Sequence, residues 1–262
     1  MKDFLLHLAA VSAAQTLPRF RTQLSVDNKL AAEGQEAEAS QFDPVTQADR
    51  EAEKAIRKAI AERFAGDRIL GEEFGVTNDG AANGWIIDPV DGTRAFISGV
   101  PLWGTLIGRH EGDCMVAGLM HQPFTGESYV ATSQGAWLVR NGVETPLSTS
   151  DVTHLNRAKL LTTSPRIFSP DTQAPYDRLE AACRLPRYGC DCYAYALLAG
   201  GHIDLVAEAG LQTYDIAPLI PIIERAGGVV RTWDGGSAKD GGNVLAAANE
   251  TLFEEAAKVL RG

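Results

Sequence analysis

Apolar side chains in the first sixty residues recur with the period of an α-helix. Residues 4–15 form one apolar stripe, which predicts an amphipathic helix that ends near Pro18 or continues beyond it with a kink. A second stripe, at 45–60, predicts another helix. Between the two stripes, residues 31–42 consist mainly of Ala, Glu, Gly, Gln and Ser, and this composition is typical of a mobile loop.

Short apolar runs in the next part of the chain have the length and composition of β-strands. They occupy 68–70, 85–87, 102–108, 115–120, 128–131 and 136–139. Turn sequences such as HEGD and QPFTGE separate neighbouring runs. This spacing favours an antiparallel meander.

Beyond about residue 145 the pattern alternates between strand-like and helix-like segments. Strands are predicted at 159–163, 203–207, 229–231 and 244–248, and helices at 173–183, 191–201, 215–226 and from 250 onwards. We therefore expect an α/β (α+β) protein made of two sheet-and-helix halves, 1–145 and 146–262.

Composition and charge narrow the possible partners. The 262 residues are 45% hydrophobic and 22% charged, which is typical of a globular chain with a large core. The formal net charge of −10 argues against a nucleic-acid or anionic-membrane surface, because both bind basic patches. No apolar run has the length of a membrane-spanning helix. The four cysteines lack the paired C-x-x-C spacing of a zinc site, so a reduced, cytoplasmic protein is expected.

Two aspartates end a buried strand in the segment WIIDPVDGT. Pro89 has no N–H for strand pairing, and Gly92 permits close approach of the backbone to a ligand. The residues from Thr93 onwards predict a helical turn, whose first amides would form an anion site suited to phosphate. Asp88 and Asp91 would repel this phosphate unless a divalent cation binds them, and carboxylate oxygens suit magnesium or manganese. The simpler alternative is that both aspartates only cap a turn.

Further acids occupy comparable positions. Glu72 and Glu73 directly follow a strand-like run. Asp49 lies in the first turn of the second predicted helix, where an ordinary solvated acid would also interact favourably with the helix dipole. Asp215 is expected to be the N-cap of the apolar helix that follows it, and Pro221 is expected to bend that helix.

Four segments together resemble the successive signatures of the inositol monophosphatase family of metal-dependent phosphatases. They are DPVTQAD at 43–49, GEE at 71–73, WIIDPVDGT at 85–93 and YDIAPLIPIIERAGG at 214–228. Two further stretches, 93–108 and 187–215, resemble the branch of this family that hydrolyses histidinol phosphate. The resemblance implies a layered α/β/α/β/α sandwich.

The same similarity implies roles for individual residues. About two or three magnesium ions per site, with manganese as an alternative, would bind oxygen ligands. The implied ligands are Glu72, Asp88, Asp91, Asp215 and the backbone carbonyl of Val90. Glu72 and Thr93 would orient and deprotonate the attacking water, and Asp49 matches a family acid near the peripheral metal positions. The amides of Gly92 and Thr93 would hold the phosphate.

Substrate choice should depend on residues other than the metal ligands. Histidinol phosphate carries an ammonium group and an imidazole, so acids near the leaving group are expected. By the resemblance, Asp191 and Glu208 match positions that contact the organic part of the substrate, and Arg187 is a further candidate at the same rim. A helix cap, a strand-end acid or a surface charge explains these three residues equally well.

The sequence therefore predicts a magnesium-dependent phosphomonoesterase that hydrolyses L-histidinol phosphate to L-histidinol and phosphate. Hydrolysis of inositol 1-phosphate or of other sugar phosphates is the alternative enzyme, and a metal-binding interaction module without turnover is the alternative outside enzymes. The expected partner is a small phosphorylated substrate, with no nucleic acid and no membrane, and a homodimer is compatible with the apolar content. The family often has a lysine in the loop ahead of V-T-x-x-D, and Lys29 is the nearest basic residue in that part of this chain; the loop at 30–42 is expected to fold over the substrate.

Overall fold

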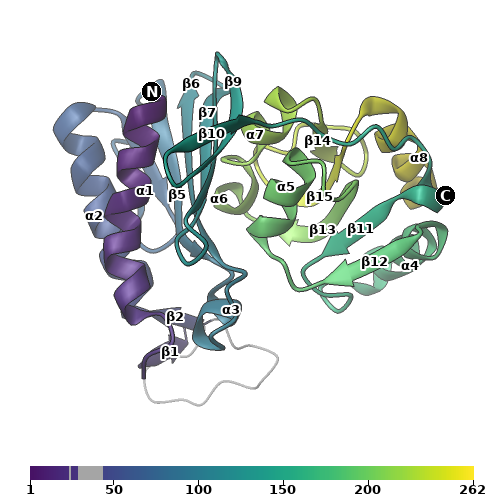
Figure 1. Ribbon diagram of the computed structural model, residues 1–262, viewed down its shortest axis with the longest axis horizontal. Helices are drawn as coiled ribbons and strands as arrows, with labels where there is room; N and C mark the ends of the chain where they lie inside the picture. Colours follow the sequence, from purple (N-terminus) through teal and green to yellow (C-terminus); the bar gives the residue numbers. More distant parts are fainter. Residues whose placement is uncertain (24, 29–43) are drawn as a thin grey trace.

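Two large β-sheets, with helices outside and between them, and one small two-stranded sheet form the framework of the described residues (Figure 1). The computed structural model describes residues 1–23, 25–28 and 44–262. The predictions for Lys29 and for a loop at 30–42 fall on residues outside these ranges. None of the helices within the ranges is long and apolar enough to cross a membrane.

The N-terminal sheet has eight strands in the order β10-β9-β8-β7-β6-β5-β3-β4. Its neighbours are antiparallel except for β3 and β5, which are parallel. The strands are β3 (Arg68–Gly71), β4 (Gly75–Thr77), β5 (Asn83–Asp91), β6 (Gly104–Glu111), β7 (Cys114–Gln122), β8 (Glu127–Thr132), β9 (Gly135–Arg140) and β10 (Val143–Pro146). The expected antiparallel meander corresponds to β5 through β9. Strands β4 and β10 were not predicted, because their residues are all exposed and show no apolar alternation.

Helices α1 (Lys2–Thr16) and α2 (Gln47–Arg63) cover the outer face of this sheet (Figure 1). Their apolar stripes pack against β5, where Trp85 is fully buried. Burial of large apolar side chains contributes about 1.5–3 kcal/mol each, so this packing holds β5 firmly in place. The smaller elements of this half are η1 (Leu17–Arg19), the two-stranded sheet of β1 (Val26–Asn28) and β2 (Pro44–Thr46), and α3 (Thr93–Ile97).

The C-terminal sheet has five strands in the order β12-β11-β13-β15-β14. Strand β11 is parallel to β12 and β13, whereas β15 is antiparallel to both of its neighbours. The strands are β11 (Lys159–Thr162), β12 (Leu185–Tyr188), β13 (Leu205–Leu211), β14 (Val229–Thr232) and β15 (Gly242–Ala247). The short edge strand β12 was not predicted, because three of its four residues are exposed. The segment between the two sheets contains η3 (Leu155–Arg157).

The remaining helices form the middle and outer layers (Figure 1). Helices α4 (Pro170–Ala182) and α8 (Glu250–Arg261) share a core with the outer face of the C-terminal sheet. Helices α5 (Cys192–Ala199) and α7 (Ile220–Arg225) contact strands of both sheets. The order helix, sheet, helix, sheet, helix confirms the expected α/β/α/β/α sandwich.

The apolar helix expected at 215–226 is instead two short helices, α6 (Thr213–Ile216) and α7. Pro218 lies in the break, where its missing N–H cannot support a continuous helix. The break also packs closely on β7: an ideal Cβ on Gly118 would lie 2.0 Å from the carbonyl oxygen of Pro218. The change of direction there places α6 against β5.

Two predictions for this region are wrong as a result. Asp215 is the third residue of α6 and not its N-cap, because the helix begins earlier than expected. Gln212 is the N-cap, and its N–H donates to Oδ2 of Asp215 at 2.7 Å. Pro221 does not bend a long helix, because it lies in the first turn of α7, where proline is well tolerated.

Candidate metal centre and substrate pocket

Three aspartates gather where the end of β5 meets α6. Asp88 and Asp91 belong to β5, and Asp215 belongs to α6. In the part of the chain that the structure describes, one carboxylate oxygen of each aspartate lies within 4.8 Å of the others. Contact between elements that are distant in sequence therefore creates this acid cluster, which we define as Asp88, Asp91 and Asp215.

The end of β5 is shaped so that both of its aspartates reach the cluster. Residues three positions apart in a regular strand point to opposite faces. A β-bulge between Asp88 and Asp91, opposite β6, removes this difference. The bulge is fixed by the hydroxyl of Thr105, which donates to the carbonyl of Pro89 at 2.9 Å, and by the N–H of Val90, which donates to Oδ1 of Asp88 at 3.0 Å.

Glu72 reaches the cluster from the neighbouring strand. It follows β3 directly, and its N–H donates to the carbonyl of Ile87 at 3.2 Å. Its side chain lies close enough to Asp88 for its charge to raise the pKa of that carboxyl. The turn after Glu72 is held by Glu53 of α2, a fully buried acid that accepts the N–H of Glu73 at 2.7 Å.

Asp49 is fully buried at the third position of α2, where the charge of Glu72 acts on it. Its Oδ2 accepts the N–H of Thr46 at 2.9 Å and the hydroxyl of the same residue at 2.6 Å. The hydroxyl of Thr93 lies 3.4 Å from Oδ1 of Asp49 and 3.0 Å from the carbonyl oxygen of Val90, so it can donate to either. Burial raises the pKa of Asp49. The alternative of a solvated first-turn acid is therefore wrong.

The electrostatics of the cluster favour a bound cation. Burial raises the pKa of both Asp88 and Asp91 well above the usual range for aspartate. Neighbouring carboxylates raise these pKa values further, chiefly Glu72 for the first and Asp191 for the second. At Asp91 a hydrogen bond offsets part of the rise in pKa: the N–H of Cys192 donates to Oδ2 at 2.6 Å. A divalent cation relieves such repulsion, and it takes hard carboxylate oxygens as ligands, so these residues fit a metal site.

A cavity of about 220 Å³, which we call the substrate pocket, adjoins the acid cluster. Two members of the cluster form part of its wall. The lining residues are Asp91, Thr163, Ile167, Asp191, Cys192, Tyr195, Glu208, Ala209, Leu211 and Asp215. The pocket therefore joins the end of β5 to α5, α6 and β13.

Asp191 occupies the N-cap position of α5 in a strained conformation. Its φ of +45° and ψ of −138° lie in a region that favours glycine, and its side chain makes no capping hydrogen bond. Burial raises the pKa of Asp191 to about 6, against the lowering effects of a side-chain hydrogen bond with Thr163 and of the charge on Arg94. Strain of this kind costs about 1–3 kcal/mol and tends to occur at functional sites.

Glu208 is a further acid in the wall of the substrate pocket. It lies in β13, and only 3% of its surface is exposed. Oε1 accepts the N–H of Thr163 at 2.5 Å and lies 3.4 Å from the hydroxyl of Thr162. Burial raises the pKa of Glu208 to about 7 despite these hydrogen bonds. The structure therefore places Asp191 and Glu208 in one pocket, with Thr163 in contact with both.

Some sequence predictions and the structure differ at this site. Arg187 is exposed on β12 and is not among the residues that line the pocket. Thr163, Glu53 and Tyr195 were not singled out from the sequence. The hydroxyl of Tyr195 is buried and has no hydrogen-bond partner among the described residues. Tyr195 is three residues after Cys192, so both residues lie on one face of α5. This spacing is the signal that could have identified Tyr195 from the sequence.

Comparisons with known proteins agree with this geometry. Residues 2–262 match the Inositol monophosphatase family. A chloroplast protein of Arabidopsis thaliana, named a bifunctional phosphatase, is 38% identical over 233 residues; these are 83% of this chain but 65% of that protein, less than two thirds of its length. A histidinol-phosphatase of Chlorobaculum parvum is 35% identical over 210 residues, 80% of each chain. An inositol monophosphatase from Zymomonas mobilis, a solved structure, has a TM-score of 0.84 and 35% identity, and the match covers 99% of this chain and 97% of that one.

These relatives define the reaction class more closely than the substrate. Two of them have the same identity to this chain, 35%, and carry different substrate names. Proteins of the family are generally metal-dependent, in agreement with the acid cluster. The match spans all but the first residue of the chain. The chain thus belongs to the inositol monophosphatase family of phosphatases.

Proposed function

We propose that this phosphatase is a magnesium-dependent phosphomonoesterase that hydrolyses L-histidinol phosphate to L-histidinol and phosphate. The observation that carries the proposal is the pair of carboxylates, half-buried Asp191 and buried Glu208, in the pocket beside the acid cluster. No lysine or arginine is among the described residues that line this pocket, and the positive charge that acts on Asp191, that of Arg94, comes from outside the lining. A substrate whose organic part is positively charged therefore fits the pocket better than a neutral one.

The proposed metal ligands are all oxygen atoms. We assign them to Glu72, Asp88, Asp91, Asp215 and the carbonyl of Val90. About two or three Mg²⁺ ions fit such a set, and Mn²⁺ is the alternative because it takes the same hard ligands. When bound, the ions lower the pKa of a water molecule and offset the negative charge of the phosphate.

The residues around the ligands position the reacting groups. We assign Glu72 and Thr93 to hold the attacking water, with Glu72 as the acceptor of its proton. Asp49 keeps the Thr93 hydroxyl in place, since the two side chains lie 3.4 Å apart. The amides of Gly92 and Thr93 are assigned to the phosphate. Gly92 has a φ of +82°, and an ideal Cβ there would lie 3.2 Å from the carbonyl oxygen of Leu102, so glycine is required at this position.

The ammonium group and the imidazole of histidinol phosphate can each pair with one of the two acids, Asp191 and Glu208. In histidinol phosphate the ammonium group lies on the carbon next to the one that carries the phosphate ester. It therefore belongs near the acid closer to the cluster, which is Asp191, whose charge acts on Asp91. The imidazole lies at the far end, where its N–H can donate to Glu208. The hydroxyl of Tyr195, which has no hydrogen-bond partner within 1–23, 25–28 and 44–262, also belongs to a residue of this pocket.

This assignment divides the work between the two halves of the chain. Residues 1–145 supply most of the metal ligands and the phosphate-binding amides. Residues 146–262 supply Asp215 and the acids that select the substrate. The alternative function, hydrolysis of inositol 1-phosphate, has the likeness to the Zymomonas mobilis structure in its favour.

The test is phosphate release from histidinol phosphate, inositol 1-phosphate and fructose 1,6-bisphosphate, measured side by side with Mg²⁺ and then with a chelator. We expect kcat/KM to be at least about tenfold higher for histidinol phosphate, as one charge-assisted hydrogen bond provides, and we expect chelation to abolish the activity. An equal or higher kcat/KM on inositol 1-phosphate would contradict the proposed substrate and leave the proposed metal chemistry unchanged. Activity that survives the chelator would contradict the metal assignment.

A further inference from the structure

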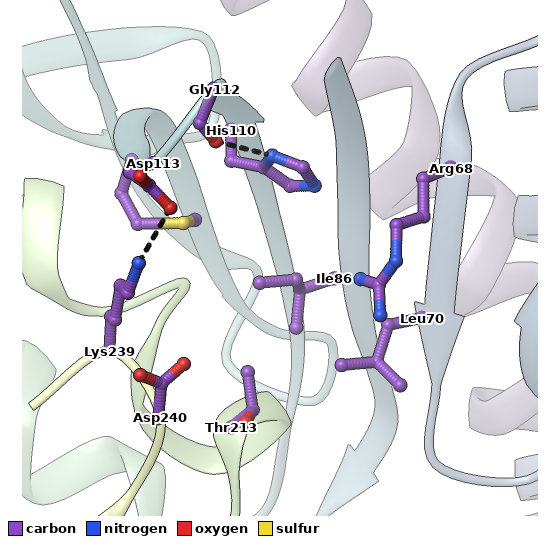
Figure 2. A pocket seen from close by; sticks show the side chains of 10 residues that line it. Arg68, Leu70, Ile86, His110, Gly112, Asp113, Thr213, Lys239 and Asp240 are labelled. Atoms are coloured by element: carbon purple, nitrogen blue, oxygen red, sulfur yellow. Dashed lines mark hydrogen bonds and ion pairs between the residues drawn. The ribbon is translucent and has the colours of Figure 1, made fainter. Parts of the chain in front are cut away.

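A second cavity, of about 200 Å³, contains none of the residues of the acid cluster (Figure 2). We call it the side cavity. Its walls come from β3, β5, the turn between β6 and β7, the start of α6 and the segment before β15. The lining residues are Arg68, Leu70, Ile86, His110, Gly112, Asp113, Met115, Thr213, Lys239 and Asp240. A cavity of about 150 Å³ holds a benzene molecule, so this one has room for a small organic ligand.

The charged groups of the side cavity balance one another. Arg68 lies on one wall, where its Nε donates to Asp79 at 3.0 Å, and Figure 2 shows the guanidinium turned toward Leu70. Asp240 lies on the other side of the cavity, near Lys239. The remaining charges form an ion pair that closes one end: Lys239 Nζ donates to Asp113 Oδ1 at 2.9 Å. Two cations and two carboxylates therefore line the cavity.

His110 adds an acceptor to this set. Its Nδ1 lies 3.0 Å from the carbonyl oxygen of Gly112, so Nδ1 carries the proton when the ring is neutral. Nε2 is then an acceptor, and it is buried without a hydrogen-bond partner in the part of the chain that the structure describes. Between the polar groups, Leu70 and Ile86 provide an apolar floor (Figure 2).

We propose that the side cavity binds a small zwitterion of the α-amino-acid class and that its occupancy changes the affinity of the metal centre. The carboxylate of the ligand pairs with Arg68, its ammonium group with Asp240, and its side chain lies on the apolar floor. Inorganic phosphate has no ammonium group for Asp240 and no apolar part for the floor, so the side cavity differs from a simple phosphate site. The inference is independent of which phosphate ester the enzyme hydrolyses.

The coupling follows from the position of the lining residues. Leu70 and Ile86 stand two residues before Glu72 and Asp88 on adjacent strands. Residues two apart in a strand share a face and lie about 7 Å from each other. Thr213, at the start of α6, likewise stands two residues before a member of the cluster. A ligand that packs on these three side chains therefore acts on three of the elements that position the metal ligands.

The test uses the full chain and the standard L-amino acids as probes, with binding measured by titration calorimetry in metal-free and Mg²⁺-loaded protein. We expect at least one amino acid to bind with a Kd below about 1 mM. Its amide, which lacks the carboxylate, and its N-acetyl derivative, which lacks the ammonium group, should each bind about tenfold more weakly or worse. The bound amino acid should change the Kd for Mg²⁺ by about fivefold or more, and Mg²⁺ should change the Kd for the amino acid by the same factor.

Variants locate the site. Arg68→Met and Asp240→Asn should each weaken the amino acid about tenfold, since each removes one charged partner. Arg157→Met, at an exposed arginine outside the cavity, is the matched control and should leave binding unchanged. If Arg68→Met does not fold, the exposed Asp240→Asn still decides the question. Three results would overturn the site: no amino acid binds at 10 mM in either metal state, binding survives both substitutions, or inorganic phosphate competes with the amino acid. An unchanged Kd for Mg²⁺ would overturn the coupling.

Discussion

The two walls of the substrate pocket are built in different ways. The first wall, which contains Asp91 of the pocket and Asp88 next to it, is one continuous segment from β5 into α3. Contacts within a few residues hold it, together with the hydroxyl of Thr105 on β6. The opposite wall combines Asp191, Glu208 and Thr163 from elements that are separate in sequence. The first wall is therefore encoded locally, and the second depends on how α5 and β13 pack.

Backbone conformation separates the two walls further. The first wall has its positive φ at Gly92, where no Cβ is present to be strained. The second wall has a positive φ at Asp191, so a carboxylate is retained where glycine would be more stable. A side chain kept at such a position has to contribute something else. We infer that the first wall carries the phosphate chemistry and that the second wall selects the organic group.

Asp91→Asn should break the first wall and produce the largest effect. The substitution keeps the shape of the side chain and removes one charge from the cluster. We expect kcat/KM to fall by more than about 1,000-fold, beyond the 10–100-fold typical of residues that only support a metal ligand. Steady-state phosphate release measures this loss, and circular dichroism should be unchanged. A variant with a near-normal rate would contradict the metal assignment.

Removal of the metal should destabilise the protein through the same wall. A ligand at about 100 times its Kd stabilises the folded state by about 2.7 kcal/mol, which corresponds to roughly 5–10 °C in Tm for a chain of this size. We therefore expect Tm to be higher by this amount in saturating Mg²⁺ than in a chelator. Thermal unfolding followed by circular dichroism measures the shift. Asp91→Asn is the control, and an equally large shift in this variant would place the stabilising ion elsewhere.

Asp191→Asn and Glu208→Gln should alter the second wall alone. Each should lower kcat/KM for histidinol phosphate about 10–30-fold, the range expected when a charge-assisted hydrogen bond is lost, and leave inositol 1-phosphate within about threefold. Asp177→Asn, at an exposed acid on α4, is the matched control. Equal losses on both substrates would mean that the two acids support the chemistry and do not select the substrate.

Asp191→Gly should produce the smallest effect, on stability. Glycine relieves the strain of the positive φ, worth about 1–3 kcal/mol, and costs about 0.5–1 kcal/mol in backbone entropy. Compared with Asp191→Asn, which also lacks the carboxylate, its free energy of unfolding should be higher by about 1 kcal/mol. Urea unfolding of the two variants measures the difference. A glycine variant that is the less stable of the two would show that the conformation at 191 is not strained.

The contrast between the walls also explains how much the sequence could predict. Both acids of β5, the glycine after them and the turn into α3 lie in one apolar-to-acidic segment, so their placement followed from local rules. Tertiary contacts decided the rest. The break at Pro218 depends on the close approach of β7, and Asp49 could be recognised as buried only once α2 was packed on the sheet.

The second wall was predictable only by resemblance. A sequence does not reveal that Asp191 has a positive φ, because the two residues before it are Gly189 and Cys190 and either could have made the turn. The contact of Thr163 with Glu208 spans 45 residues and depends on the pairing of β11 with β13. Strands β4, β10 and β12 were missed because exposed residues dominate them.

The measurement that tests the central claim most directly is a cycle that combines one substitution with one change of substrate. It compares kcat/KM for histidinol phosphate and for its deaminated analogue, which lacks the ammonium group, in the wild-type enzyme and in Asp191→Asn. We predict that loss of the ammonium group costs the wild-type enzyme about 10–30-fold and the variant less than about threefold, a coupling of about 1 kcal/mol or more. The same factor in both enzymes would contradict the claim that the second wall recognises a cationic substrate.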